Sequence, residues 1–117
     1  MILTIDMGNS NIVVGGIDEN KLYFEERITT DHRKTSLEYA IMLKNILDIS
    51  KIKRSDIEGA ILSSVVPPLN APISSAVKAS FTSLINPFAK ARNFAVSKNA
   101  YGSISFASIS LLASRLA

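Results

Sequence analysis

The 117-residue sequence contains no cysteine and only one histidine, and it has no acidic residue after Glu58. The lack of cysteine excludes a disulfide framework and a cysteine-based metal site. No apolar run approaches the roughly 20 residues that span a bilayer. The first residues also lack the charged segment, apolar stretch and cleavage site of a secretory signal. We therefore expect a cytoplasmic protein without a membrane partner.

The acidic residues are confined to the first half of the chain. All ten lie between Asp6 and Glu58, where eight lysines and arginines nearly balance them. Residues 59–117 carry five basic residues and no acidic one. A basic arm that binds nucleic acid is one interpretation of this split. Because the five charges are scattered rather than gathered in a patch, we expect no nucleic-acid partner.

Short apolar runs in the first 28 residues predict strands. The runs cover residues 2–6, 11–18 and 21–28, separated by turn residues. Connections this short join antiparallel neighbours, so the three strands are expected to form a meander. Within the second run, Gly15-Gly16 marks either a β-bulge or a close approach of the backbone to a ligand or helix.

A helix is expected next, because apolar residues recur at helical spacing up to about Ser50. Thr35 or Ser36 can cap it, and Glu38 completes a capping box if Thr35 is the cap. A buried strand over 59–66 should then run parallel to the first strand, since a helical crossover joins them.

Pro67-Pro68 should end this strand, because proline cannot donate to a ladder, and a second helix is expected to begin within residues 69–78. The chain is thus predicted to be α/β, with the order β-β-β-α-β-α.

The turn between the first two strands carries the residues most suited to binding a ligand. Asp6 ends the first strand, where its carboxylate can face Mg²⁺ or the water around it. Gly8 allows a tight turn and a close approach to an anion. Asn9, Ser10 and Asn11 add donors that can form an anion-binding nest with the backbone N–H groups. The alternative is a plain β-hairpin with a Gly/Asn turn.

The string Asp-Met-Gly-Asn-Ser-Asn-Ile-Val-Val-Gly, at residues 6–15, resembles the first phosphate motif of the type III pantothenate kinases, Asp-x-Gly-Asn-Thr/Ser-Asn. That family belongs to the superfamily of actin, sugar kinases and heat-shock chaperones. Three more segments resemble the family in the same order, at residues 27–31, 34–39 and 63–68. The resemblance covers roughly residues 1–78.

The resemblance implies that residues 1–78 are the N-terminal lobe of an actin-like ATPase (ribonuclease H-like) fold. It implies ATP-dependent phosphorylation of pantothenate to 4'-phosphopantothenate in coenzyme A biosynthesis, with ATP bound in a cleft between two lobes. It further implies Mg²⁺, a monovalent cation (K⁺ or NH₄⁺) and a homodimer. Asp6 is the implied metal-side residue. The implied cofactor-binding residues are Asp6, Met7, Gly8, Asn9, Ser10, Asn11, Ile12 and Val13.

Residues 79–117 form a divergent tail, with eight serines, no acidic residue and no later family motif. The Gly-x-Asp-Arg segment that would supply the catalytic base is missing, and so is the second phosphate motif, Asp-x-Gly-Thr. Residues 99–102 include a tyrosine near the place of a substrate contact, but the surrounding pattern does not fit. We expect a truncated or frameshifted product that is inactive by itself, with unknown catalytic residues. A genuinely divergent C-terminus is the alternative.

Several residues outside the turn allow two interpretations. Residues 63–68 form either a wall of the active cleft or a core strand with a proline stop. His32 is expected in a solvated loop rather than as a ligand. Arg33 and Lys34 can attract an anionic nucleotide, although a solvated loop is the default. Residues 104–116 can form a short apolar helix.

Two other classes of function remain open from the sequence. One is a non-catalytic nucleotide-binding protein or transcriptional accessory protein of the same family. The other is a remnant that does not fold stably, because a missing second lobe would leave an apolar face exposed.

Overall fold

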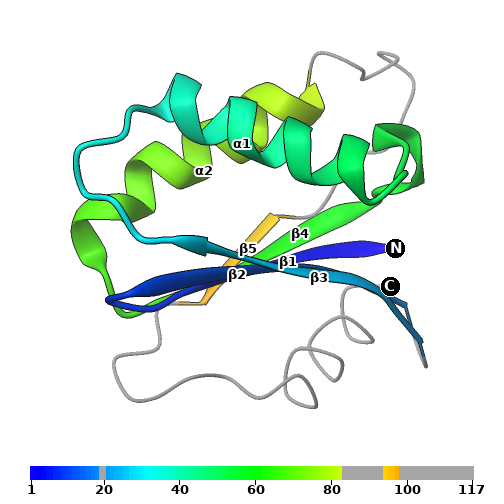
Figure 1. The fold of residues 1–117 in the computed structure, drawn as a ribbon, viewed down its shortest axis with the longest axis horizontal. Helices are drawn as coiled ribbons and strands as arrows, with labels where there is room; N and C mark the ends of the chain where they lie inside the picture. Colours follow the sequence, from blue (N-terminus) through cyan, green and yellow to red (C-terminus); the bar gives the residue numbers. More distant parts are fainter. Residues whose placement is uncertain (19–20, 83–93, 98–117) are drawn as a thin grey trace.

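The computed structural model describes residues 1–18, 21–82 and 94–97. Within this part of the chain, one sheet has the strand order β3-β2-β1-β4-β5, and helices α1 and α2 lie on the same face of it (Figure 1). The elements are β1 (Ile2–Met7), β2 (Asn11–Asp18), β3 (Lys21–Thr29), α1 (Ser36–Ile49), the short 3₁₀ turn η1 (Arg54–Asp56), β4 (Gly59–Ser64), α2 (Pro67–Thr82) and β5 (Phe94–Ser97).

The predicted β-β-β-α-β-α order is confirmed. β2 pairs antiparallel with both β1 and β3, and β4 pairs parallel with β1 after the crossover through α1. The structure adds β5, which pairs parallel with β4 and was not expected from the sequence. α2 begins at Pro67 and not at residue 69, because proline is well suited to the first turn of a helix, where its missing N–H has no partner in any case.

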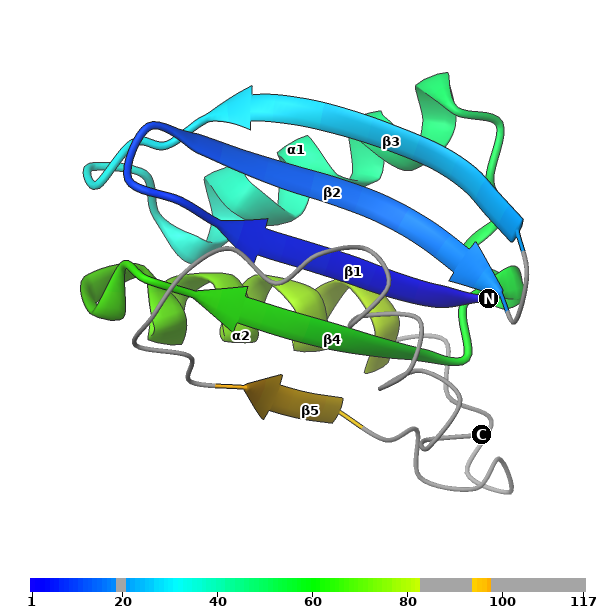
Figure 2. The same ribbon diagram turned by 90° about the horizontal axis from the view of Figure 1, so that it is seen from below.

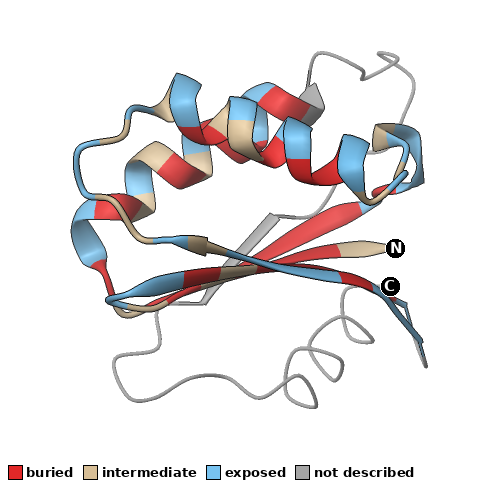
Figure 3. Cartoon of the chain, viewed as in Figure 1, coloured by how far each residue is buried: buried red, intermediate tan, exposed pale blue. Residues whose placement is uncertain are grey.

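The hydrophobic core lies between the sheet and the two helices. Leu3, Ile5 and Met7 alternate along β1 toward the helices, and each is at most 2% exposed. α1 meets them with four buried residues, Tyr39, Leu43, Ile46 and Leu47, which fall on one face of the helix. Figure 3 shows this division, with buried residues on the inner side of α1 and exposed ones outside. The chain therefore has a well-packed core on the helix side of the sheet.

Both ends of α1 are fixed by local hydrogen bonds. Thr35 is the N-cap, and the predicted capping box is confirmed: the Thr35 N–H donates to the Glu38 carboxylate at 2.6 Å, and the Glu38 N–H donates to Thr35 Oγ1 at 3.3 Å. At the other end Lys51 adopts a left-handed φ of 58°. The N–H of Ile52 then reaches the carbonyl of Leu47 at 2.9 Å, which completes a Schellman motif.

The β2–β3 register shifts between Gly16 and Ile17, so the pairing is irregular where the sequence suggested a bulge, but the extra residue, Tyr23, lies on β3 and not on β2. A Cβ at Gly16 would lie 2.4 Å from Cε1 of Phe24 and 2.8 Å from Sδ of Met1. The backbone of β2 thus closely approaches the aromatic ring of its neighbouring strand.

Several segments meet at one end of the sheet. β1, β3 and β4 all run toward this end, and the β1–β2 turn lies there as well (Figure 2). The loop from Thr30 to Thr35 also starts there, because β3 ends opposite the first residue of β2. The four segments that resemble the kinase family therefore converge in space.

Candidate phosphate-binding site

The turn from Gly8 to Asn11 joins β1 to β2 at this end of the sheet. It is closed by a hydrogen bond from the Gly8 N–H to the Asn11 carbonyl at 2.8 Å. A Cβ at Gly8 would lie 3.0 Å from that same carbonyl oxygen, which explains why a residue without a side chain occupies the position. Asn9, Ser10 and Asn11 are exposed. The turn is tight, and its polar side chains are open to solvent.

The backbone of the turn also offers donors. In the part of the chain that the structure describes, the N–H groups of Asn9 and Ser10 donate to no protein acceptor. With the Ser10 hydroxyl and the two asparagine amides, they form a cluster of donors without a carboxylate among them. Such a cluster suits an anion with several oxygens.

Asp6 lies two residues before the turn, on the face of the sheet opposite the helices. It is half-buried and aligned in register with Val13 on β2 and Ser63 on β4. Among the described residues no donor or cation pairs with its carboxylate. Burial raises the pKa of Asp6 above its ordinary value. The carboxylate therefore does not cap the turn, and a cation nearby would relieve its desolvation.

The donor set at Asp6 fits a metal ion that takes most of its ligands from elsewhere. The described residues contain no group of three or more histidine, cysteine or acidic side chains that could hold an ion by themselves. Mg²⁺ commonly binds through one or two carboxylates, with phosphate oxygens and waters completing its shell. A single carboxylate beside an anion-binding turn fits a magnesium ion that arrives with a nucleotide.

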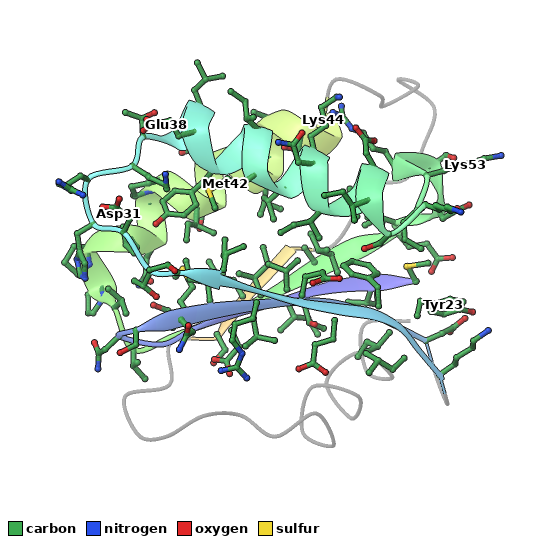
Figure 4. The ribbon with its side chains drawn as sticks, viewed as in Figure 1. Tyr23, Asp31, Glu38, Met42, Lys44 and Lys53 are labelled. Atoms are coloured by element: carbon green, nitrogen blue, oxygen red, sulfur yellow. The ribbon has the colours of Figure 1, made fainter. Side chains whose placement is uncertain are left out.

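The loop that follows β3 brings further polar groups to the same end. Asp31 accepts from the backbone N–H of Arg33 at 2.9 Å and from its Nε at 3.3 Å. These contacts lower the pKa of Asp31. His32 is exposed, as expected for a solvated loop residue. Figure 4 shows Asp31 and Glu38 at one end of the molecule and Tyr23 and Lys53 at the other.

Residues 63–68 lie at the same end of the sheet, on the β4 side of the turn. Ser63 and Ser64 are buried, and Oγ of Ser64 accepts from the Val66 N–H at 3.0 Å just before α2 starts. Val65 donates its N–H to the Met7 carbonyl at 3.1 Å, so this segment lies beside the end of β1. Pro67 and Pro68 remove two of the N–H groups that a helix N-terminus usually offers an anion. The donors for a phosphate at this end therefore come mainly from the Gly8–Asn11 turn.

The apolar residues of the motif pack in the core or against neighbouring strands and do not form part of the donor cluster. Met7 and Ile12 are at most 1% exposed and belong to the core on the helix side of the sheet. Val13 is half-buried, next to Asp6 in register. The buried side chains of Met7 and Ile12 hold the two ends of the turn against the core, so they can meet a ligand only through their backbone atoms.

A family model described as type III pantothenate kinase matches residues 2–101 of this chain. The chain belongs to the type III pantothenate kinase family. The match continues past residue 78, where the sequence motifs end, and it includes β5. The α/β arrangement is that of an N-terminal lobe of the actin-like ATPase fold, as the resemblance implied.

Individual relatives agree with the family assignment. The type III pantothenate kinase of Finegoldia magna is 50% identical over 78 residues, which are 67% of this chain and 30% of the relative. The type III pantothenate kinase of an Exiguobacterium species is 48% identical over 73 residues, 62% of this chain and 29% of the relative. That of Brevibacillus brevis is 42% identical over 73 residues, with the same shares. The chain thus spans about 30% of the length of the curated relatives it matches.

None of the helices in the described ranges is both long and apolar enough to cross a membrane.

Proposed function

We propose that this lobe supplies the ATP-phosphate and Mg²⁺ side of a type III pantothenate kinase, an enzyme that phosphorylates pantothenate to 4'-phosphopantothenate in coenzyme A biosynthesis. The observation that carries the proposal is the Gly8–Asn11 turn, with its outward donors, directly after the Asp6 carboxylate, which has no partner among the described residues. Phosphoryl transfer requires held phosphates, a divalent cation and a positioned base. The lobe offers residues for the first two.

In this proposal the donors of the turn bind phosphate, and the carboxylate of Asp6 serves the metal ion. The N–H groups of Asn9 and Ser10 and the Ser10 hydroxyl donate to phosphate oxygens. Asp6 would hold Mg²⁺ through its water shell, and the bound ion would neutralise phosphate charge. Because Asp6 is half-buried, its negative charge is less screened than a surface charge, and it attracts the cation more strongly.

We propose further that this chain by itself does not turn over substrate. Among the described residues we identify no general base for the pantothenate hydroxyl, and positioning together with base catalysis contributes much of the acceleration of such a reaction. A coupled assay of the pure protein with pantothenate and MgATP should show no phosphorylation above background. Turnover would contradict this part of the proposal. A monovalent-cation site, a homodimer and a cytoplasmic location stay predictions.

The proposal is tested by calorimetric titration with MgATP of the wild type, Asp6→Asn and Asp48→Asn. Asp48 is exposed on α1 and pairs with Lys44 at 3.0 Å, so its variant makes the same charge change away from the turn. We expect Asp6→Asn to weaken MgATP binding about tenfold or more, which corresponds to the loss of at least about 1.4 kcal/mol. Asp48→Asn should bind as the wild type does.

No binding by a folded wild type would refute the proposal. Equal weakening by both variants would show that only net charge matters and would refute the role of Asp6. Binding without turnover in any assembly would favour the non-catalytic nucleotide-binding alternative.

A further inference from the structure

Thr30, the first residue after β3, connects the phosphate-binding turn to the rest of the lobe. Its Oγ1 donates to the Gly8 carbonyl at 2.7 Å, and its backbone N–H donates to the Ser10 carbonyl at 3.0 Å. The Asn11 carbonyl is taken by the Gly8 N–H. Three carbonyl oxygens of one short turn are therefore bound by donors inside the lobe, two of them by Thr30.

These contacts decide which backbone groups the turn presents to a ligand. A carbonyl oxygen repels a phosphate oxygen, whereas an N–H attracts it. With the carbonyls of Gly8 and Ser10 held toward Thr30, the backbone groups of the turn without a protein partner in the described part of the chain are the N–H groups of Asn9 and Ser10 and one carbonyl, that of Asn9. Thr30 thus holds the turn in the orientation that a phosphate requires.

Asp31, which follows Thr30, is held by α1. Tyr39 is 2% exposed, and its hydroxyl donates to the Asp31 carbonyl at 2.6 Å and accepts from the Asp31 N–H at 3.3 Å. A continuous set of contacts therefore runs from the core helix through Asp31 and Thr30 to the turn. A residue locked in this way can orient a ligand-binding turn before the ligand arrives, which lowers the entropic cost of binding.

We infer that Thr30 is a positioning residue for nucleotide binding, acting through the backbone of Gly8 and Ser10 without touching the nucleotide. The inference rests on the proposed function and adds a residue from outside the phosphate motif. It also gives a physical reason for the segment at residues 27–31, which resembles the kinase family and contains Thr30.

The test compares Thr30→Val, Thr30→Ser and Thr29→Val. Valine has nearly the shape of threonine but removes the Oγ1 donor, and serine keeps that donor. Thr29 is exposed and is the last residue of β3, directly before Thr30, so Thr29→Val makes the same chemical change at the adjacent position. Two quantities are measured: amide hydrogen exchange at Gly8, with the buried Leu43 on α1 as the reference for global stability, and the dissociation constant for MgATP.

Thr30→Val should speed exchange at Gly8 about threefold to tenfold relative to Leu43 and weaken MgATP binding by a similar factor, the range expected for one hydrogen bond. Thr30→Ser and Thr29→Val should stay within about twofold of the wild type on both measures. The rescue by serine distinguishes the hydroxyl donor from the volume of the side chain.

If the wild type binds MgATP, either of two results would overturn the inference. Unchanged exchange at Gly8 in Thr30→Val would show that Thr30 does not hold the turn, whatever the MgATP affinity of that variant. Faster exchange with unchanged MgATP affinity would show a merely structural contact. Failure of the wild type to bind MgATP would refute the proposed function, and with it any role of Thr30 in nucleotide binding. The exchange measurement would still decide whether Thr30 holds the turn.

Discussion

Gly16 has no room for a side chain, and the structure gives a magnitude for adding one. A methyl group there would lie 2.4 Å from Cε1 and 2.9 Å from Cδ1 of Phe24. Carbon atoms pack best at about 3.5–4.0 Å, so the ring must retreat by about 1 Å. Phe24 is only 8% exposed and belongs to the core, so it has little space to move into. Met1, which lies 2.8 Å away through Sδ, is half-buried at the chain end and can yield.

We therefore expect Gly16→Ala to destabilise the fold by about 1–2 kcal/mol. Overpacking a core costs about 1–3 kcal/mol, and the lower entropy of the unfolded chain with alanine offsets about 0.4–1 kcal/mol of that. Urea unfolding followed by circular dichroism measures the change. The midpoint should fall with little change in the slope, because the surface exposed on unfolding is almost the same.

A double-mutant cycle tests the cause. Phe24→Leu removes the ring atoms that a methyl group at Gly16 would meet. The double variant should then cost less than the sum of the two single variants by about 1 kcal/mol, since contacting residues are coupled. Additivity within about 0.3–0.5 kcal/mol, or a neutral Gly16→Ala, would refute the reasoning from the Phe24 contact.

Four further substitutions have defined outcomes. Asp6→Asn should stabilise the ligand-free lobe at pH values above the raised Asp6 pKa. The folded state holds the Asp6 proton more tightly than the unfolded state, so wild-type stability falls as the pH rises from the unfolded-state pKa through the folded-state pKa. Melting temperatures measured from about pH 3 to about pH 8 should therefore fall for the wild type relative to the variant as the pH rises. Thr35→Ala should cost about 1 kcal/mol by chemical unfolding, because it removes the acceptor of the α1 cap. The Thr35 N–H lowers the pKa of Glu38. The stability that the Glu38 carboxylate contributes is therefore present above the ordinary carboxyl pKa and lost on acidification, and Glu38→Gln should remove this pH dependence of the unfolding free energy. Lys51→Gly should raise stability by up to about 1 kcal/mol, since it relieves the left-handed φ at the end of α1, and a loss instead would show that the lysine side chain matters more than the backbone.

The parts of the fold that local sequence patterns determine were predicted well. The capping box of α1 depends on two residues three positions apart, and the pattern at Thr35 and Glu38 identified it. The meander followed from apolar runs joined by short turns. The parallel pairing of β1 with β4 followed from the crossover helix between them.

Features that depend on distant residues could not be predicted in this way. β5 has only four residues, and it is a strand because it lies beside β4, about thirty positions earlier in the chain. The choice at Gly16 between a bulge and a close approach was open until the position of Phe24 was known. The contacts of Thr30 with Gly8 and Ser10 span some twenty residues and involve carbonyl groups, which every residue type carries. No pattern of residue types indicates them.

The candidate site shows the same division. The motif from Asp6 to Val13 predicted a turn with anion-binding donors, and the structure gives that turn a specific geometry. The sequence did not separate residues by the direction of their side chains, so Met7 and Ile12 were grouped with Asn9 and Ser10 although they face the core. It also did not show that the Asp6 carboxylate lacks a partner in the described part of the chain.

The most direct test of the central claim is to follow the amide resonances of the lobe by NMR during titration with MgATP. The account predicts that the amides of Asn9 and Ser10 shift most, since they have no acceptor among the described residues and would donate to phosphate oxygens. Amides at the far end of α1, around Ile49, should stay in place. Largest shifts elsewhere, or none at Asn9 and Ser10 when ATP binds, would show that the turn is not the phosphate-binding site.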